Sequence, residues 1–328
     1  MRARCGLFLV AAGERRSDAG RALRLGARTY HGRLATCLTM GVFLLLHTLG
    51  GLTGLAQNTD APKDGPDASL LSAPPRSWVV DAAANELIAL HHKNSYLRYR
   101  METVNEKGSQ VRDVIESKDG TVARLILKDG RPLTPEQDEG ERERLNDMIA
   151  SPAAYAKHVK NGDSEKKMAD TLVPLMPDAM INTYTPGQPQ SGRNGGALEI
   201  VLDYKPNPKW VPPNTEAQAL TGLEGRVWID AKTRYVVRME GTIFRGVNFG
   251  WGMLAHIYPG GKVVLNQTDA GGDRWIFTDF SMQLNVRALM VKTLNIHSTA
   301  KASGFQTLEP LSYQDAIHLL LSTPLPNK

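Results

Sequence analysis

The chain has 328 residues and a formal net charge of +5, with an isoelectric point near 9.1. A basic balance of this kind ordinarily indicates nucleic acid or an anionic surface as a partner. The basic residues are unevenly placed, however: residues 1–56 hold eight arginines and two acids, whereas residues 57–328 hold 31 basic and 32 acidic residues. The body of the protein is therefore nearly neutral, and we expect no nucleic-acid partner.

Both cysteines of the chain, Cys5 and Cys37, belong to the same N-terminal region. Residues 57–328 therefore have no thiol, which excludes disulfide bonds, thiolate metal sites and cysteine nucleophiles from the body of the protein. The remaining composition, with 41% hydrophobic and 22% charged residues, is that of an ordinary globular protein.

Residues 1–56 have the features of a secretory signal peptide. An apolar stretch over 38–56 follows arginine-rich sequence, and Gly54 and Ala56 place small residues just before Gln57, where cleavage is expected. This signal predicts a periplasmic protein. Four glycines and a histidine within the stretch suit a permanent membrane span poorly. An uncleaved N-terminal anchor stays open as the alternative, and no cysteine follows that would carry a lipid.

The next elements are a linker, a helix and three strands. Residues 57–76 are polar and proline-rich without a hydrophobic period, which predicts a flexible linker. A helix follows, with an apolar face made of Val80, Ala83, Ala84, Leu87 and His91. Strands are then expected over 96–104, 110–117 and 122–128, because turn residues such as Asp119-Gly120 separate three β-rich runs.

A helical insertion is predicted over about 135–176. Thr134-Pro135-Glu136-Gln137 has the pattern of a capping box, in which the threonine and glutamine side chains bond to each other's backbone amides. Ser151-Pro152 repeats the start signal, so we expect two or three short helices. The run Glu136–Arg144 interleaves both charges at helical spacing, which is typical of a solvated helix face.

The rest of the chain is predicted to be mostly strand. Alternating or β-rich runs bounded by turn residues cover 197–204, 225–230, 235–244, 251–258, 262–268, 275–286 and 291–301. A terminal helix follows Ser312. We therefore expect one α+β domain over 77–328, built as a curved antiparallel sheet of about ten strands, a half-barrel, wrapped around several helices.

Gly225-Arg226-Val227-Trp228-Ile229-Asp230, followed by Arg238-Met239-Glu240-Gly241, resembles the paired strands of the LolA/LolB-like superfamily of periplasmic lipoprotein carriers. The order of elements resembles that half-barrel fold as well. The stretch from about Asn85 to Leu320 is more closely similar to a family of uncharacterised exported bacterial proteins, in segments such as Phe249–Gly252. The resemblance implies an apolar concavity suited to acyl chains or to a lipidated partner protein. That implication is an analogy from fold, and no functional residue of the carriers can be transferred.

No catalytic or metal-binding pattern stands out in residues 57–328. The six histidines there form no metal-ligand spacing, and no G-x-S-x-G elbow is present. Gly250-Trp251-Gly252 opens a formal G-x-G-x-x-A match, but a strand and a turn follow it where a dinucleotide loop needs a helix. We therefore expect no cofactor, no metal site and no catalytic residues.

Apolar strand faces are the candidates for ligand binding. The strand over 275–286 alternates apolar and polar residues, and a second apolar face runs along 235–244. Methionine side chains adapt to different ligands, and tryptophan suits the mouth of a pocket. The tentative apolar lining is Trp228, Met239, Trp251, Phe280, Met282 and Leu284. An ordinary core is the alternative, because every sheet needs one apolar face.

These observations support three hypotheses about function. The first is a non-enzymatic exported binding protein, a carrier of an apolar ligand or a lipidated protein of the outer-membrane lipoprotein-sorting type. The alternative is an envelope sensor or scaffold that acts through contacts with another envelope protein. An enzyme is the third hypothesis, and it requires a compact polar cluster with strongly perturbed carboxylates. The oligomeric state is not predicted.

Overall fold

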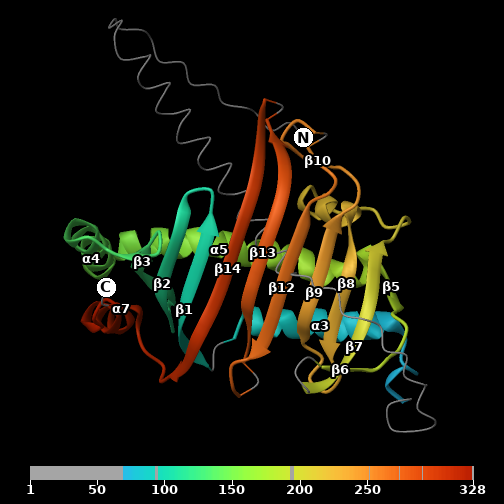
Figure 1. The fold of residues 1–328 in the computed structure, drawn as a ribbon, viewed down its shortest axis with the longest axis horizontal. Helices are drawn as coiled ribbons and strands as arrows, with labels where there is room; N and C mark the ends of the chain where they lie inside the picture. The colour runs from blue at the N-terminus through green and yellow to red at the C-terminus, as the bar shows by residue number, and fades with distance from the viewer. Residues whose placement is uncertain are drawn as a thin grey trace, which may run out of the picture. The chain divides into compact units, whose positions relative to one another are not determined.

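The computed structural model describes residues 69–92, 95–192, 196–250, 252–272, 274–289 and 291–326, except for the side chains of 161–165. The predicted signal peptide, most of the predicted linker and Trp251 lie outside these residues. The described chain combines helices with an open antiparallel sheet (Figure 1). The α+β class is therefore confirmed. The described residues form 14 strands, more than the ten predicted.

The helices in chain order are α3 (Pro75–Leu90), α4 (Pro135–Ala150), α5 (Pro152–Leu172), α6 (Met176–Ala179) and α7 (Tyr313–Ser322), with 3₁₀ turns η1 (Val173–Leu175) and η3 (Glu216–Gly222). Helix α3 corrects two predictions. It begins at Pro75, inside the predicted linker, because proline is well suited to the first position of a helix. Its buried residues are Trp78, Val79, Ala82 and Ala83, whereas Val80, predicted to face inward, is exposed.

Helices α4 and α5 fill the segment for which short helices were predicted, and α5 is longer than expected, with 21 residues. The capping box at the start of α4 is confirmed: the Gln137 amide donates to Thr134 Oγ1 at 3.3 Å, and the Thr134 amide donates to Gln137 Oε1 at 3.0 Å. The solvated face predicted for α4 is wrong at Glu141. That side chain is buried because its Oε1 accepts a hydrogen bond from the Leu125 amide at 2.7 Å.

One part of the sheet has the order β10-β11-β13-β14-β1-β2-β3-β4, with β12 also paired to β13. The bounds are β1 (Tyr96–Asn105), β2 (Gly108–Ser117), β3 (Gly120–Lys128), β4 (Arg131–Pro132), β10 (Val247–Phe249), β11 (Ala255–Ile257), β12 (Lys262–Asp269), β13 (Trp275–Ala288) and β14 (Lys292–Leu308). The strand predicted over 251–258 is shorter than expected. A turn with positive φ at Gly250 and Gly252 occupies its first half, and only β11 remains.

The other part has the order β5-β7-β8-β9, with β6 paired to β7. The bounds are β5 (Met180–Tyr184), β6 (Gln190–Gly192), β7 (Gly196–Pro206), β8 (Leu223–Asp230) and β9 (Val236–Ile243). Backbone hydrogen bonds join β9 to the start of β12, since Ile243 donates to Gly261 at 2.8 Å and Gly260 donates to Ile243 at 2.7 Å. Figure 1 shows the strands of both parts side by side in one layer.

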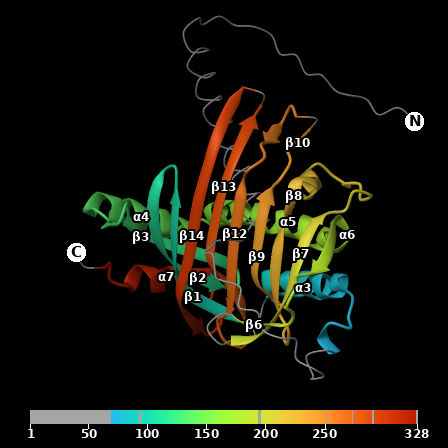
Figure 2. The same cartoon turned by 45° about the vertical axis from the view of Figure 1, so that its right-hand side comes forward.

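The two faces of the sheet have different surroundings. In Figures 1 and 2, α3 and α5 run behind the strands and cross them on the same side. We call this the inner face, and the side that carries no helix in these views the outer face. Helices α4 and α7 lie beside β2 and β3, at the opposite end of the sheet from β5. No helix within the described ranges has the length and apolar character needed to cross a membrane.

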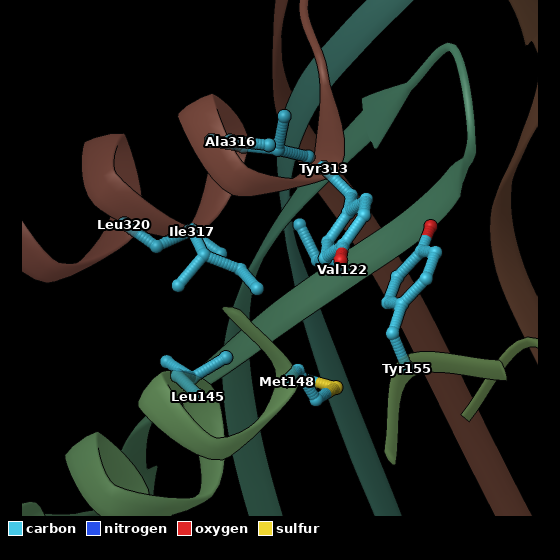
Figure 3. Close-up of a cluster of buried hydrophobic side chains, with 9 residues drawn as sticks. Val122, Leu145, Met148, Tyr155, Tyr313, Ala316, Ile317 and Leu320 are labelled. Carbon is cyan, nitrogen blue, oxygen red and sulfur yellow. The ribbon is translucent and has the colours of Figure 1, made fainter. Parts of the chain in front are cut away.

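A separate apolar core holds α4 and α7 against β2 and β3 (Figure 3). Its fully buried members include Val122, Leu145 and Leu320. The rings of Tyr155 and Tyr313 stack at 3.6 Å between centroids, which ties α5 to α7. Arg124 lies beside this core, and its guanidinium donates to the Leu320 and Thr323 carbonyls at the end of α7. The terminal helix is thus fixed by packing and by hydrogen bonds to its free carbonyl groups.

Candidate functional site

A small cavity lies between α3 and the inner face of the sheet. Its volume is about 100 Å³. The helical wall is made of Val79, Ala82, Ala83, Glu86, Val173 and Met176. The sheet wall is made of Met180, Asn182, Tyr204, Val227, Ile229, Val236, Met239, Leu265 and Gln267. Most of these side chains are apolar, so the cavity suits an apolar ligand or an apolar part of one.

Glu86 is the acidic group of this cavity. Its Oε2 accepts a hydrogen bond from Gln267 Nε2 at 3.0 Å, and its Oε1 accepts a longer one from the Val236 amide at 3.4 Å. Burial among apolar side chains raises the pKa of Glu86 to about 7, although these two hydrogen bonds act in the opposite direction. The carboxyl group therefore changes its charge near neutral pH.

Tyr204 crosses the sheet next to the cavity. Its hydroxyl donates to the Glu240 carbonyl oxygen at 2.6 Å, two strands away from its own. This path is open because Gly225 and Gly241 face each other on β8 and β9 and have no side chains to block it. Burial raises the pKa of Tyr204 far above its ordinary value, so the phenol stays neutral.

Methionine side chains on both walls make the cavity lining adaptable. Three methionines, Met176, Met180 and Met239, contribute to the walls, and their unbranched side chains can change rotamer at low cost. Ligand pockets usually have volumes of about 300–1,000 Å³. At about 100 Å³, the cavity has room for about three water molecules at about 30 Å³ each. A longer ligand requires these side chains, or α3, to move.

A second hollow lies on the outer face. This outer groove has a volume of about 830 Å³ and crosses β5, β7, β8, β9, β12 and β13. Its lining is largely polar, and much of its charge is paired within the sheet. Arg226 donates to Asp203 at 2.7 and 3.2 Å, and Arg238 at its edge donates to Glu240 at 2.9 and 2.7 Å. The outer groove is therefore suited to polar contacts and poorly suited to an apolar chain.

The six predicted lining residues do not form one site. Met239 is the one that lines the cavity. Phe280, Met282 and Leu284 are buried on the same inner face, next to the cavity through the pairing of Phe280 with Leu265, but they belong to filled core. Trp228 lies on the outer face, where Arg238 and Arg226 stand 5.5 and 6.0 Å from its ring. Trp251 lies outside the described residues.

Sequence reasoning missed Glu86 and Gln267. Glu86 is at i+4 from Ala82 and at i+3 from Ala83, so it continues the buried stripe of α3. A buried stripe through Val79, Ala82 and Ala83 would have placed it on the inner face. Gln267 follows Leu265 by two positions on β12, so the alternation of the strand places both side chains on the inner face; the extra residue of the bulge, Thr278, lies on β13.

Within the described ranges, histidine, aspartate and glutamate side chains form no group of three or more that could hold a metal ion. Comparisons of the chain with protein-family models, with curated proteins and with solved structures found no match in any of the three.

Proposed function

We propose that this protein is an exported, non-enzymatic binding protein whose apolar ligand inserts between α3 and the inner face of the sheet. The observation that carries this proposal is the cavity beneath α3, because it is apolar, lined by three methionines and open enough to start insertion. An acyl chain, free or attached to a lipidated protein, has the chemistry of such a ligand. Each methylene group that leaves water contributes about 0.8 kcal/mol.

Ligand entry widens the cavity by moving α3 away from the sheet. The polar attachments of α3 to other elements are all made by side chains of the helix: Trp78 Nε1 donates to Tyr184 Oη at 2.9 Å, and Asn85 Nδ2 donates to the Thr233 carbonyl at 3.0 Å. Arg76 and Asp81 form ion pairs with Asp178 and Arg234, and Glu86 accepts hydrogen bonds from Gln267 and Val236. Between these attachments, α3 faces the sheet with the small buried side chains of Ala82 and Ala83. A helix held in this way can be displaced without breaking a sheet.

The helices behind a curved antiparallel sheet also support a carrier of the LolA/LolB-like type, as does the resemblance of the β8 and β9 sequences. In this proposal the sheet is a half-barrel wrapped around its helices, and the protein works in the periplasm after removal of residues 1–56. Sequencing the N-terminus of the exported protein tests the location. We expect Gln57 as the first residue, and an intact leader would favour an anchored form.

Displacement of a fluorescent fatty acid tests the binding function. We expect the purified protein to bind the probe with a micromolar or lower Kd, and gently purified protein to release bound lipid in native mass spectrometry. Met239→Trp should abolish probe binding by filling the cavity, whereas Trp228→Phe on the outer face should leave it unchanged. Equal effects of the two substitutions, or no probe binding by the wild type, would contradict the proposal.

The outer groove favours a second candidate, an envelope scaffold or sensor. It is wide and polar, and Lys205, Glu224 and Lys262 point charges along it. A protein partner with complementary charge would bind there with a strong dependence on salt. Reversing two of these charges, with Lys205→Glu and Lys262→Glu, should weaken capture of such a partner and leave fatty-acid binding intact.

A further inference from the structure

Glu86 differs in its partners from three of the buried carboxylates. Asp113 contacts Arg98, Glu116 contacts Arg274, and Glu141 contacts Arg144, all at 2.5–2.8 Å. Glu86 instead accepts hydrogen bonds from two neutral N–H groups. Within the described ranges, no arginine, lysine or histidine lies within ion-pair distance of it.

The chemistry of the cavity leaves room for one kind of partner. An ionised carboxylate has about four acceptor positions on its two oxygens, and Glu86 uses two of them. The other polar side chains of the lining are neutral: Asn182, Tyr204 and Gln267. A ligand that brings a positive charge compensates the buried carboxylate, and a ligand that brings a negative charge is repelled by it.

We infer that the ligand of this cavity is a single-chain amphiphile that ends in a protonated amine, with the ammonium group on Glu86 and the chain against Val227, Met239 and Leu265. This inference rests on the proposed function and names its ligand class. The ammonium group has three donors and suits the free acceptor positions of Glu86. The same charge weakens the binding of an amphiphile with an anionic head group, such as a fatty acid, relative to an amine of the same chain length.

The binding of such an amine depends on pH through Glu86. Its pKa of about 7 would fall toward the ordinary 4.5 once a cation is bound. Linkage then requires the affinity to rise with pH through this range, by up to about 70-fold between pH 5 and pH 8. An amine with eight carbons keeps its charge throughout, because alkylammonium groups titrate near pH 10.

Other titratable groups lie around the site, and each of the charged ones named below has a partner of its own. Tyr204, in the sheet wall, stays neutral. On α3, Asp81 pairs with Arg234 at 3.6 Å, and His91 contacts Asp170. His92, just beyond α3, contacts Glu116, which also binds Arg274 next to β13. Asp230 at the end of β8 accepts hydrogen bonds from Thr233. Histidines also titrate near neutral pH, so the test needs a variant that removes Glu86 alone.

Calorimetric titration of the purified full chain with octylammonium, octanol and octanoate at pH 5, 6, 7 and 8 tests the inference. We expect octylammonium to bind most tightly at pH 8 and to weaken steeply toward pH 5, while octanol binding stays constant. Glu86→Gln keeps the size of the side chain and should remove both the preference for the amine and its pH dependence. Asp81→Asn removes a paired carboxylate elsewhere on α3 and should change neither.

Each result decides between the inference and the function on which it rests. Octanol binding with no preference for the amine, or an amine affinity that Glu86→Gln leaves unchanged, would overturn the inference and keep the binding function. Tighter binding of octanoate than of octylammonium at pH 8 would do the same. No binding of any of the three compounds by a folded protein would overturn both.

Discussion

Gln267 on β12 donates a hydrogen bond to Glu86 on α3 at 3.0 Å, although the two residues lie 181 positions apart in the chain. This contact closes one side of the cavity, because it connects its helical wall with its sheet wall. It also places an ionisable group where apolar side chains would otherwise meet. The stability of the protein and its binding chemistry therefore depend on the same carboxyl group.

Glu86→Gln should remove a pH dependence of stability. Since the folded-state pKa of about 7 lies above the unfolded value of about 4.5, the folded state holds the proton more tightly. The free energy of unfolding of the wild type should thus fall as the pH rises from about 4.5 to about 7, by at most about 3 kcal/mol. Urea denaturation at pH 5, 6, 7 and 8 measures this fall.

The variant should show a flatter profile over the same range and should be more stable than the wild type at pH 8. Asp81→Asn is the matched control, because it removes an exposed carboxylate from the same helix. A profile that falls equally in Glu86→Gln and in the wild type would assign the pH dependence to groups other than Glu86.

Gly225→Ala should destabilise the sheet beside the cavity. A methyl group there would overlap the carbonyl oxygen of Glu240 and come within 2.8 Å of the Tyr204 hydroxyl. Neither atom can move freely, because the two are hydrogen-bonded to each other. We expect a loss of about 3 kcal/mol or more in the free energy of unfolding, measured by chemical denaturation.

Gly140→Ala provides the control for this prediction. Gly140 lies in the interior of α4, and nothing lies within 4 Å of an added methyl group. Alanine is the better helix former, so this substitution should stabilise the protein by about 0.5–1 kcal/mol. Similar losses at both positions would show that the close approach at Gly225 is not the cause.

Much of the sheet could be predicted from local patterns, because turn residues separate most of the longer strands from one another. All ten predicted strands overlap observed ones, and the four that were missed, β4, β5, β6 and β10, have two to five residues each. Such segments contain too few residues for an alternating pattern to appear. Their pairing depends on neighbours that are distant in the chain.

The candidate site was harder to predict, because it depends on which face each side chain joins. Val227 and Trp228 are adjacent and both apolar, and the sequence does not tell which one faces the helices. Trp228 can lie on the outer face because two arginines cover its ring. Glu141 was missed in the same way: its role, binding the Leu125 amide, requires knowing which helix lies beside that strand.

Arg124→Met should destabilise the protein, because it removes the hydrogen bonds that hold the end of α7. The Arg124 side chain is 1% exposed and donates to Leu320, Thr323 and Asp138 at 2.8–2.9 Å. Its loss leaves two carbonyl groups without their donor and leaves Asp138 with Arg142 alone, which should cost about 3–5 kcal/mol in the free energy of unfolding. Arg142→Met, which removes the more exposed partner of Asp138, should cost less than about 1 kcal/mol.

The loss of stability caused by Arg124→Met should depend on pH in the acid range. Burial alone would raise the pKa of Asp138, but hydrogen bonds from Arg124 and Arg142 outweigh it and hold the pKa below its ordinary value. Asp138 thus contributes stability that is present above about pH 4 and is lost as the pH falls through the folded-state pKa. The difference between wild type and Arg124→Met should therefore narrow at pH 3. A constant difference would assign the effect of Arg124 to packing alone.

Met239→Ala and Met282→Ala should distinguish a residue that lines the cavity from one that belongs to the filled core beside it. Both methionines are buried on the inner face, so each truncation should lower the free energy of unfolding by about 2–5 kcal/mol. Only Met239 lines the cavity, so only Met239→Ala should enlarge it and strengthen the binding of a bulkier apolar probe by several-fold. Fluorescent fatty-acid titration of both variants measures this difference. If Met282→Ala changed probe binding as much as Met239→Ala did, the ligand would have to lie deeper, between the sheet and α5.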